Sequence, residues 1–300
     1  MNNQEKIIKI FVINLKRSVE RRQEILKRMN LYEIPFEFFD AIEGQLLDDS
    51  VMNKIHSKGN LFRKMYGRDM EKGEAGAAMS HLSVYRKIIE DDISAAIVLE
   101  DDVDFDSLFK FFLFNTNDIE SVFKPYELIL MGYSEMFHHH VSGQTSFWHR
   151  KKIGKGLYIG KPINWCWGAY AYIITKKGAE KIMSQEDVPI MQADFLTANS
   201  PYYGIKMGIL SKPIVWPGKL NKISTIRDRQ GNPDIDIRSQ SVPQAMQQPE
   251  NFLYILYKFA GKLKTSLAKK IKPIKLFVKK VSLNDYQFIV NLKAYDQNNT

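Results

Sequence analysis

The sequence contains a single cysteine and no long uninterrupted apolar run. With Cys166 alone, an intramolecular disulfide is excluded. No apolar stretch approaches the roughly 20 residues that a membrane-spanning helix needs. The apolar run at residues 10–13 is too short for the core of a signal peptide, and Asn14 follows it where a small-residue cleavage site would be required. We therefore expect a protein that is made and kept in the cytoplasm.

Outside one segment, the positive and negative charges of the sequence nearly cancel. The chain carries a formal net charge of +9, and nine lysines but only one acid lie between residues 250 and 280. Apolar residues recur there at spacings of three and four, which predicts a basic amphipathic helical tail over residues 251–300, interrupted at Pro273. A polar linker over residues 227–250 precedes it. Such a tail suits an anionic membrane surface; packing against the domain is the alternative.

Strand-like and helix-like segments alternate over roughly the first 215 residues. This alternation predicts one α/β domain over residues 1–226, with a Rossmann-like, mostly parallel sheet flanked by helices. Residues 43–72, by contrast, are polar and predict a loop with short helical pieces. The expected strands lie at residues 7–13, 35–39, 95–99, 127–131, 169–174 and 206–215, and the expected helices at residues 18–30, 75–90, 106–114, 176–183 and 191–199.

Three acids follow directly on the apolar strand at residues 95–99. Glu100, Asp101 and Asp102 therefore stand at the edge where open α/β sheets bind their ligands. Three neighbouring carboxylates repel one another unless a cation or hydrogen-bond donors compensate them. Their oxygens suit Mg²⁺ or Mn²⁺ bound to a pyrophosphate, with Asp102 as a metal ligand and Glu100 or Asp101 completing the shell or holding a ribose. A solvated acidic turn is the alternative.

Basic and polar side chains follow the first strand at the same edge of the sheet. Asn14 can pair with a base or a ribose, and Leu15 lies beside it. Arg17, Arg21 and Arg22 offer guanidinium groups that match phosphate geometry. Arg21 and Arg22 are adjacent on a helix and point apart, so that at most one should reach a ligand, and we favour Arg22. Their alternative is to face solvent.

Histidines occur in two settings. Ser80 and His81 lie within the expected helix at residues 75–90, where His81 is a candidate for ligand binding, although a mid-helix histidine is more often a structural hydrogen-bonding group. The histidines at residues 138–140 are consecutive, and their side chains diverge too much to bind one metal ion. We expect these three on a surface loop. Trp165 and Trp167 suit either sugar stacking or core packing.

In this order, the segments resemble glycosyltransferase family 25, the lipopolysaccharide and lipooligosaccharide sugar transferases of Gram-negative bacteria. The resemblance extends over most of residues 7–226. It rests on residues 12–22, 39–44, 73–81, 97–103 and 168–179, with a weaker match at 224–226.

The resemblance implies a GT-A fold and inverting transfer of a hexose from UDP-galactose or UDP-glucose to a lipooligosaccharide acceptor sugar. The acidic turn takes the place of the family's metal and nucleotide motif, with Mn²⁺ or Mg²⁺ as the cation. Inversion needs a base for the acceptor hydroxyl. Asp194, in the segment that corresponds to the family's Pro-hydrophobic-Asp pattern, is the first candidate and Asp187 the second. The chain departs from the family at Lys16, where an acid is usual, and at Ala77, where a cysteine is usual.

The implied partners are a UDP-sugar, a lipid-linked oligosaccharide acceptor and an anionic membrane surface, which would place the protein peripherally on the cytoplasmic face of the inner membrane.

Two other functions use the same features. A metal-dependent phosphoester hydrolase would employ the same carboxylates, but such sites usually gather further histidines or a lysine. A nucleic-acid-binding protein would employ the lysine-rich tail, but the tail has no arginine beyond Arg238 and its aromatic residues look like core contacts, so that no nucleic-acid partner is expected.

Overall fold

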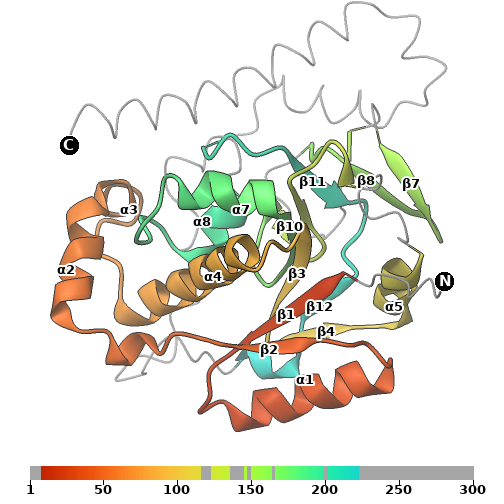
Figure 1. Ribbon diagram of the computed structural model, residues 1–300, viewed down its shortest axis with the longest axis horizontal. Coiled ribbons are helices and arrows are strands. Elements are labelled where there is room, and N and C mark those ends of the chain that lie inside the picture. Colours follow the sequence, from red (N-terminus) through yellow and green to blue (C-terminus); the bar gives the residue numbers. More distant parts are fainter. Residues whose placement is uncertain are drawn as a thin grey trace, which may run out of the picture.

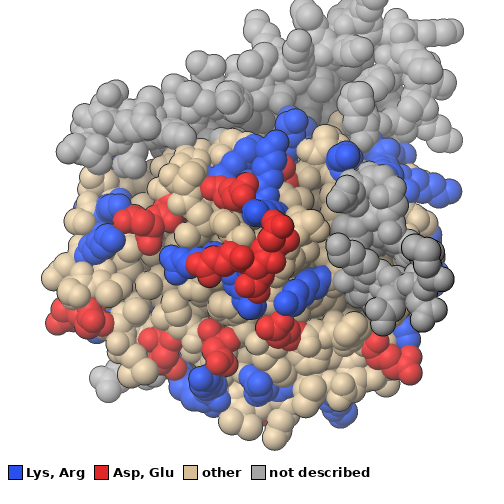
Figure 2. All heavy atoms as spheres, in the orientation of Figure 1, with Lys and Arg blue, Asp and Glu red and all other residues tan. Residues whose placement is uncertain are grey.

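The computed structural model describes residues 8–115, 123–135, 145–146, 150–163, 166–198 and 202–222. The expected linker at residues 227–250, the basic tail at residues 251–300 and the histidines at residues 138–140 lie outside these ranges. Within them, no helix has both the length and the apolar character needed to cross a bilayer. On the face seen in Figure 2, acidic and basic side chains lie close together, in keeping with a domain that is nearly neutral.

The described residues form a central eight-stranded sheet with helices on both faces (Figure 1). Six strands run in one direction, and β8 and β10 run in the opposite one, which confirms the expected mostly parallel α/β sheet. The order across the sheet is β2 (Glu37–Asp40), β1 (Lys9–Asn14), β3 (Ala95–Glu100), β10 (Ala171–Thr175), β5 (Leu128–Leu130), β11 (Met207–Leu210), β8 (Leu157–Gly160) and β7 (Lys151–Gly154).

Each face of the sheet is covered by its own apolar layer. Side chains alternate along β1, so that Phe11 and Ile13 join one core while Ile10 and Val12 join the other. The first core lies under α2 (Asp49–Lys58), α3 (Asn60–Tyr66), α4 (Lys72–Glu90), α7 (Lys176–Met183) and α8 (Ala193–Ala198). The second lies under α1 (Val19–Leu31) and α5 (Ser107–Phe114).

Two short pairings differ from the expected strands. Residues 103–105, directly after the acidic turn, form β4 (Val103–Phe105), which pairs antiparallel with β12 (Val215–Pro217). The single strand expected at residues 206–215 is therefore two strands, β11 and β12, in different sheets. β6 (Ser134–Glu135) pairs with β9 (Cys166–Trp167). These pairings join residues far apart in sequence, which a local hydrophobic pattern does not reveal.

The chain after β2 packs against α4 through main-chain atoms. A 3₁₀ turn, η1 (Gly44–Leu46), crosses the start of α4 so closely that a Cβ on Gly76 would lie 2.6 Å from the Cα of Gly44. Ser80 fixes the same crossing, because its Oγ accepts a hydrogen bond from the Ile42 N–H at 2.8 Å and donates to the Gly76 carbonyl at 2.7 Å. Glycine at both positions thus lets the loop and the helix form one continuous wall.

Candidate active site

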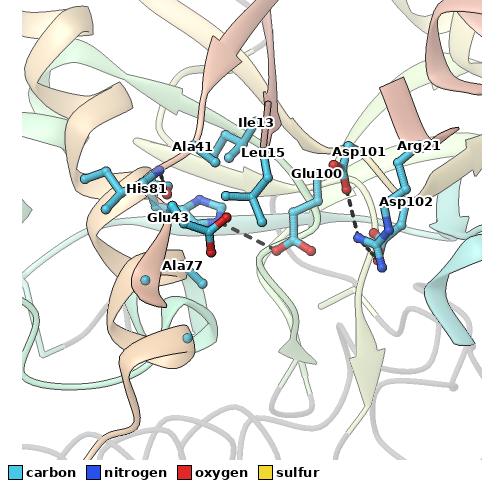
Figure 3. Close-up of a pocket in the computed structure, with 14 residues that line it drawn as sticks. Ile13, Leu15, Arg21, Ala41, Glu43, Ala77, His81, Glu100, Asp101 and Asp102 are labelled. Atoms are coloured by element: carbon cyan, nitrogen blue, oxygen red, sulfur yellow. Dashed lines mark hydrogen bonds and ion pairs between the residues drawn. The ribbon is translucent and has the colours of Figure 1, made fainter. Parts of the chain in front are cut away.

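A cavity of about 200 Å³ opens where β1, β2 and β3 end (Figure 3). The carboxyl ends of parallel strands are where open α/β sheets bind ligands. The acidic turn forms one side of the cavity, and the loop after β2 together with α4 forms the other. Its lining consists of Ile13, Leu15, Arg21, Ala41, Ile42, Glu43, Gly44, Gly73, Ala77, Ser80, His81, Glu100, Asp101 and Asp102.

Both carboxylate oxygens of Asp101 bind neighbouring side chains and so hold them in place. Its Oδ2 accepts a hydrogen bond from Asn14 Nδ2 at 2.7 Å, and its Oδ1 lies 2.9 Å from a terminal nitrogen of Arg21. The same arginine nitrogen lies 3.1 Å from Asp102 Oδ2. All three charged side chains are about nine-tenths buried, with 9–11% of their surface exposed. One guanidinium therefore bridges two carboxylates and links α1 to the end of β3.

Glu100 and Asp102 lack full compensation for their charge. Burial, with the nearby charges of Asp194 and Asp101, raises the pKa of Glu100 to about 8, although Arg21 opposes the shift. Burial and the charge of Glu100 raise the pKa of Asp102 to about 7. The Glu100 side chain is 36% exposed, but the surface it exposes faces the narrow cavity, where solvation is poor. A cation in the cavity would favour the ionised form of both groups.

The donor set fits a divalent cation that also binds phosphate. The described ranges contain no cluster of three or more His, Cys, Asp or Glu side chains able to hold a metal unaided. Mg²⁺ and related ions, however, are commonly held by one or two carboxylates together with substrate phosphates. Glu100 and Asp102 supply two such carboxylates beside one cavity, and the charge of Glu100 raises the pKa of Asp102.

Arg21, and not the favoured Arg22, lies at the acidic turn. Arg22 donates to Asn14 Oδ1 at 3.2 Å, and its guanidinium carbon lies 3.7 Å from the centre of the Phe38 ring. Arg21 is part of the cavity lining and Arg22 is not, so that one of the two adjacent arginines reaches the cavity. The signal that identifies Arg21 is helical spacing, because it precedes the buried Ile25 and Met29 at intervals of four and so shares their inward face.

Other predicted ligand-binding residues are engaged by the protein itself. Asn14 is 1% exposed, and its amide contacts Asp101, Arg22 and the Ser18 carbonyl. Arg17 forms an ion pair with Glu43 at the cavity rim. Leu15 and Ser80 line the cavity, Ser80 with its hydroxyl already bonded.

His81 is a buried cavity-lining residue. Its Nδ1 lies 2.8 Å from the Tyr172 hydroxyl, and its Nε2 lies 3.6 Å from Glu100 Oε1 (Figure 3). Burial lowers the pKa of His81 to about 4, so that the ring is neutral at physiological pH. Tyr172 and its partner Tyr85 were not foreseen from the sequence, where they show only as apolar positions of a strand and a helix.

The two candidate bases lie in contrasting surroundings. Asp194 is near Glu100 and His81, since its charge acts on the pKa of both. Its Oδ1 accepts a hydrogen bond from the Ala169 N–H at 2.7 Å, Trp167 also donates to it, and burial raises its pKa. Asp187 lies on the exposed surface between Lys54 and Lys58, which hold its pKa far below the usual range. The structure does not bring Asp187 to the cavity.

Replacing Arg21 with methionine should destabilise the protein, because the carboxylates of the turn then lose their positively charged partner. Breaking a buried ion pair typically lowers the free energy of unfolding by about 3–5 kcal/mol. Because Arg21 lowers the pKa of Glu100 and Asp102, its loss raises both further above their unfolded values. The part of the destabilisation that comes from Glu100 and Asp102 is present at pH 9 and is lost as the pH falls through about 8 and 7, the folded-state pKa values of the two acids, because below them both are protonated in the folded protein with or without Arg21.

Urea unfolding at pH 5 and pH 9 measures this effect. Arg17→Met is the matched control, because the Arg17 side chain is 50% exposed and its ion pair with Glu43 is worth at most about 1 kcal/mol. An Arg21→Met loss of equal size at both pH values would contradict the account of the turn.

Comparison with solved structures gives weak overall likeness. The inositol-1-phosphate CTP transferase from T. maritima aligns with a TM-score of 0.36 at 12% identity, over 72% of this chain and 91% of that one. Mouse xyloside xylosyltransferase 1 aligns with a TM-score of 0.31 at 9% identity, over 71% of this chain and 84% of that one.

Sequence comparison gives relatives of higher identity than the solved structures do. Human procollagen galactosyltransferase 2 is 33% identical over 132 residues, which are 42% of this chain and 21% of that protein. Procollagen galactosyltransferase 1-B of Xenopus laevis is 28% identical over 181 residues, 59% of this chain and 28% of that protein. A bovine relative described as probable inactive glycosyltransferase 25 family member 3 is 27% identical over 180 residues, 59% of this chain and 29% of that protein. The chain thus spans less than a third of each relative.

Residues 7–197 match the family model described as glycosyltransferase family 25 (LPS biosynthesis protein). That region is more than half of the chain and contains all of the cavity-lining residues. Membership of such a family supports sugar transfer as the activity. The chain belongs to glycosyltransferase family 25.

Proposed function

We propose that the protein is an inverting hexosyltransferase that moves galactose or glucose from a UDP-sugar to a sugar of lipooligosaccharide or lipopolysaccharide. The observation that carries the proposal is the cavity at the ends of β1, β2 and β3, into which two incompletely compensated carboxylates face. Galactose is the sugar named in the relatives called procollagen galactosyltransferases. The family description names LPS biosynthesis, which supports the glycan acceptor.

The two walls of the cavity suit the two halves of a nucleotide diphosphate. Ile13, Leu15 and Ile42 provide apolar surface for a planar base. Glu100 and Asp102 would hold Mn²⁺ or Mg²⁺ against the diphosphate, and the cation would offset the charge that builds on the departing UDP. Arg21 keeps Asp102 at the cavity edge and adds positive charge beside it.

Asp194 is the proposed base. In the transfer, the acceptor hydroxyl oxygen forms a bond to the anomeric carbon, the bond from that carbon to UDP breaks, and the hydroxyl proton passes to the carboxylate. A base with a pKa raised towards neutrality takes such a proton more readily, and burial raises the pKa of Asp194. The bonds from Ala169 and Trp167 hold the carboxyl in place. Asp187, held by two lysines at the surface, has no part in this mechanism.

We further propose that the protein works at the cytoplasmic face of the inner membrane. The support is the lysine-dense, amphipathic sequence of residues 251–300, since each basic residue near an anionic leaflet contributes about 1 kcal/mol of attraction. A lipid-linked acceptor would be found at that surface.

Binding of the UDP-sugar should require a divalent cation. In thermal-shift measurements, UDP-galactose or UDP-glucose with Mn²⁺ should raise the melting temperature, and Asp102→Asn should abolish that shift and reduce transfer about 10²–10³-fold. Asp104→Asn is the matched control, because Asp104 lies two residues away, pairs with Arg28 and is not part of the cavity lining. Undiminished transfer by Asp102→Asn would refute the site. Cleavage of phosphoesters without any acceptor would favour a hydrolase.

The proposed base should affect chemistry more than binding. Asp194→Asn retains an acceptor for the Ala169 N–H but removes the basic group, so kcat should fall about 10²–10⁴-fold while affinity for the UDP-sugar changes little. Asp187→Asn should leave kcat unchanged. Steady-state kinetics with a fixed acceptor and calorimetric titration of the donor separate the two effects. A kcat for Asp194→Asn within a few-fold of the parent value would exclude this residue as the base.

The tail can be tested apart from catalysis. The full chain should sediment with vesicles that contain anionic lipid and should be released as salt rises, because attraction to the leaflet is screened. Neutral vesicles serve as the control. A chain shortened after residue 248 should stay in the supernatant, and its sedimentation with anionic vesicles would disprove the role of the tail.

A further inference from the structure

A chain of three buried polar groups ends at the cavity. The Tyr85 hydroxyl lies 2.8 Å from the Tyr172 hydroxyl, which in turn lies 2.8 Å from Nδ1 of His81. Tyr85 and His81 come from α4, and Tyr172 comes from β10, opposite Val98 of β3. None of the three side chains is more than 2% exposed. The other ring nitrogen of His81, Nε2, faces Glu100.

The hydrogen bonds between these three side chains can run in one of two directions, because a mixed arrangement, in which Tyr172 accepts from both neighbours, leaves the Tyr172 proton without an acceptor among the described residues. A neutral imidazole carries one proton and each hydroxyl carries one. In the first direction Tyr85 donates to Tyr172, Tyr172 donates to Nδ1, and the imidazole proton is on Nε2. In the second, Nδ1 donates to Tyr172, Tyr172 donates to Tyr85, and the Tyr85 proton needs a further acceptor.

One observation favours the first direction. Among the residues that the structure describes, the Tyr85 hydroxyl has Tyr172 as its one hydrogen-bonding partner, so the second direction leaves a buried O–H without an acceptor. A buried donor without an acceptor is destabilising by about 1–3 kcal/mol.

We propose that Tyr85 and Tyr172 hold His81 as the Nε2–H tautomer, a fixed neutral donor aimed at Glu100, and that His81 is thereby a positioning residue for this carboxylate. The Nε2–Oε1 distance of 3.6 Å is too long for a hydrogen bond in the ligand-free protein. Such contacts often tighten when substrate is bound. The positioning role rests on the proposed function, whereas the tautomer does not.

The tautomer can be observed directly. Long-range ¹H–¹⁵N spectra of the full chain, labelled at its six histidines, distinguish a protonated ring nitrogen from an unprotonated one. The His81 signals are those lost in His81→Gln. We expect a protonated Nε2 in the parent protein, and a partial shift towards the other tautomer in Tyr172→Phe, which removes the donor to Nδ1. A parent protein with its proton on Nδ1 would overturn the proposal.

His56 provides an internal control in the same spectra. Its Nε2 lies 2.9 Å from the Met70 carbonyl, which accepts only, so that Nε2 of His56 also carries a proton. Because Met70 and Tyr172 are separate partners, the His56 signals should not respond to Tyr172→Phe. Equal changes in both histidines would mean that the substitution disturbs the fold and that the specific hydrogen-bond chain is not what sets the tautomer.

The positioning role predicts a pattern in the kinetics. A hydrogen bond to a charged group contributes about 1.5–3 kcal/mol, so His81→Leu should raise the KM for the UDP-sugar about 10–100-fold. His81→Gln supplies an amide donor and should restore most of this loss. If His81→Leu does not fold, Tyr172→Phe should still raise KM, by a smaller factor. Unchanged KM in the folded variants would refute the positioning role, whereas a parent protein that binds no UDP-sugar would refute the proposed function and leave the tautomer result standing.

Discussion

The hydrogen-bonded contact of Arg21 with Asp101 and Asp102 is the interaction on which the site depends. It places one buried positive charge among three neighbouring acids and joins α1 to the end of β3. Burial, together with the negative charge that one guanidinium leaves uncompensated, raises the pKa values of Glu100 and Asp102. Proteins commonly keep such a conflict where it serves binding, at the expense of stability. A cation bound at this edge would relieve the conflict.

The antiparallel strand β10 brings the second half of the sheet to the same place. Because β10 runs against β3, its first residues lie at the edge where β1 and β3 end. Ala169, just before β10, can therefore donate to Asp194 beside the cavity. Tyr172 of the same strand reaches His81. In an entirely parallel sheet, the start of this strand would lie at the opposite edge, far from the acidic turn.

Much of this architecture could be predicted from local pattern. The apolar runs before Asn14 and Glu100 predict buried parallel strands, and their shared edge follows from their direction. Which arginine faces inward was also encoded, in the spacing of Arg21, Ile25 and Met29. The pairing of β4 with β12 was not, since it joins residues about a hundred positions apart. Nor does sequence alone distinguish Asp187 from Asp194, because burial and lysine partners arise from tertiary packing.

The crossing of η1 over α4 has a consequence for how the cavity can change. At Gly44 and Gly76 the two segments touch through main-chain atoms, so no exchange of side-chain rotamers can move one away from the other. This wall therefore keeps its position whatever the side chains around it do. Room for a larger or differently shaped donor has to come from lining side chains outside this crossing, such as Leu15, which substitution can shorten or extend. Variation in donor size within this scaffold is thus confined to a few positions.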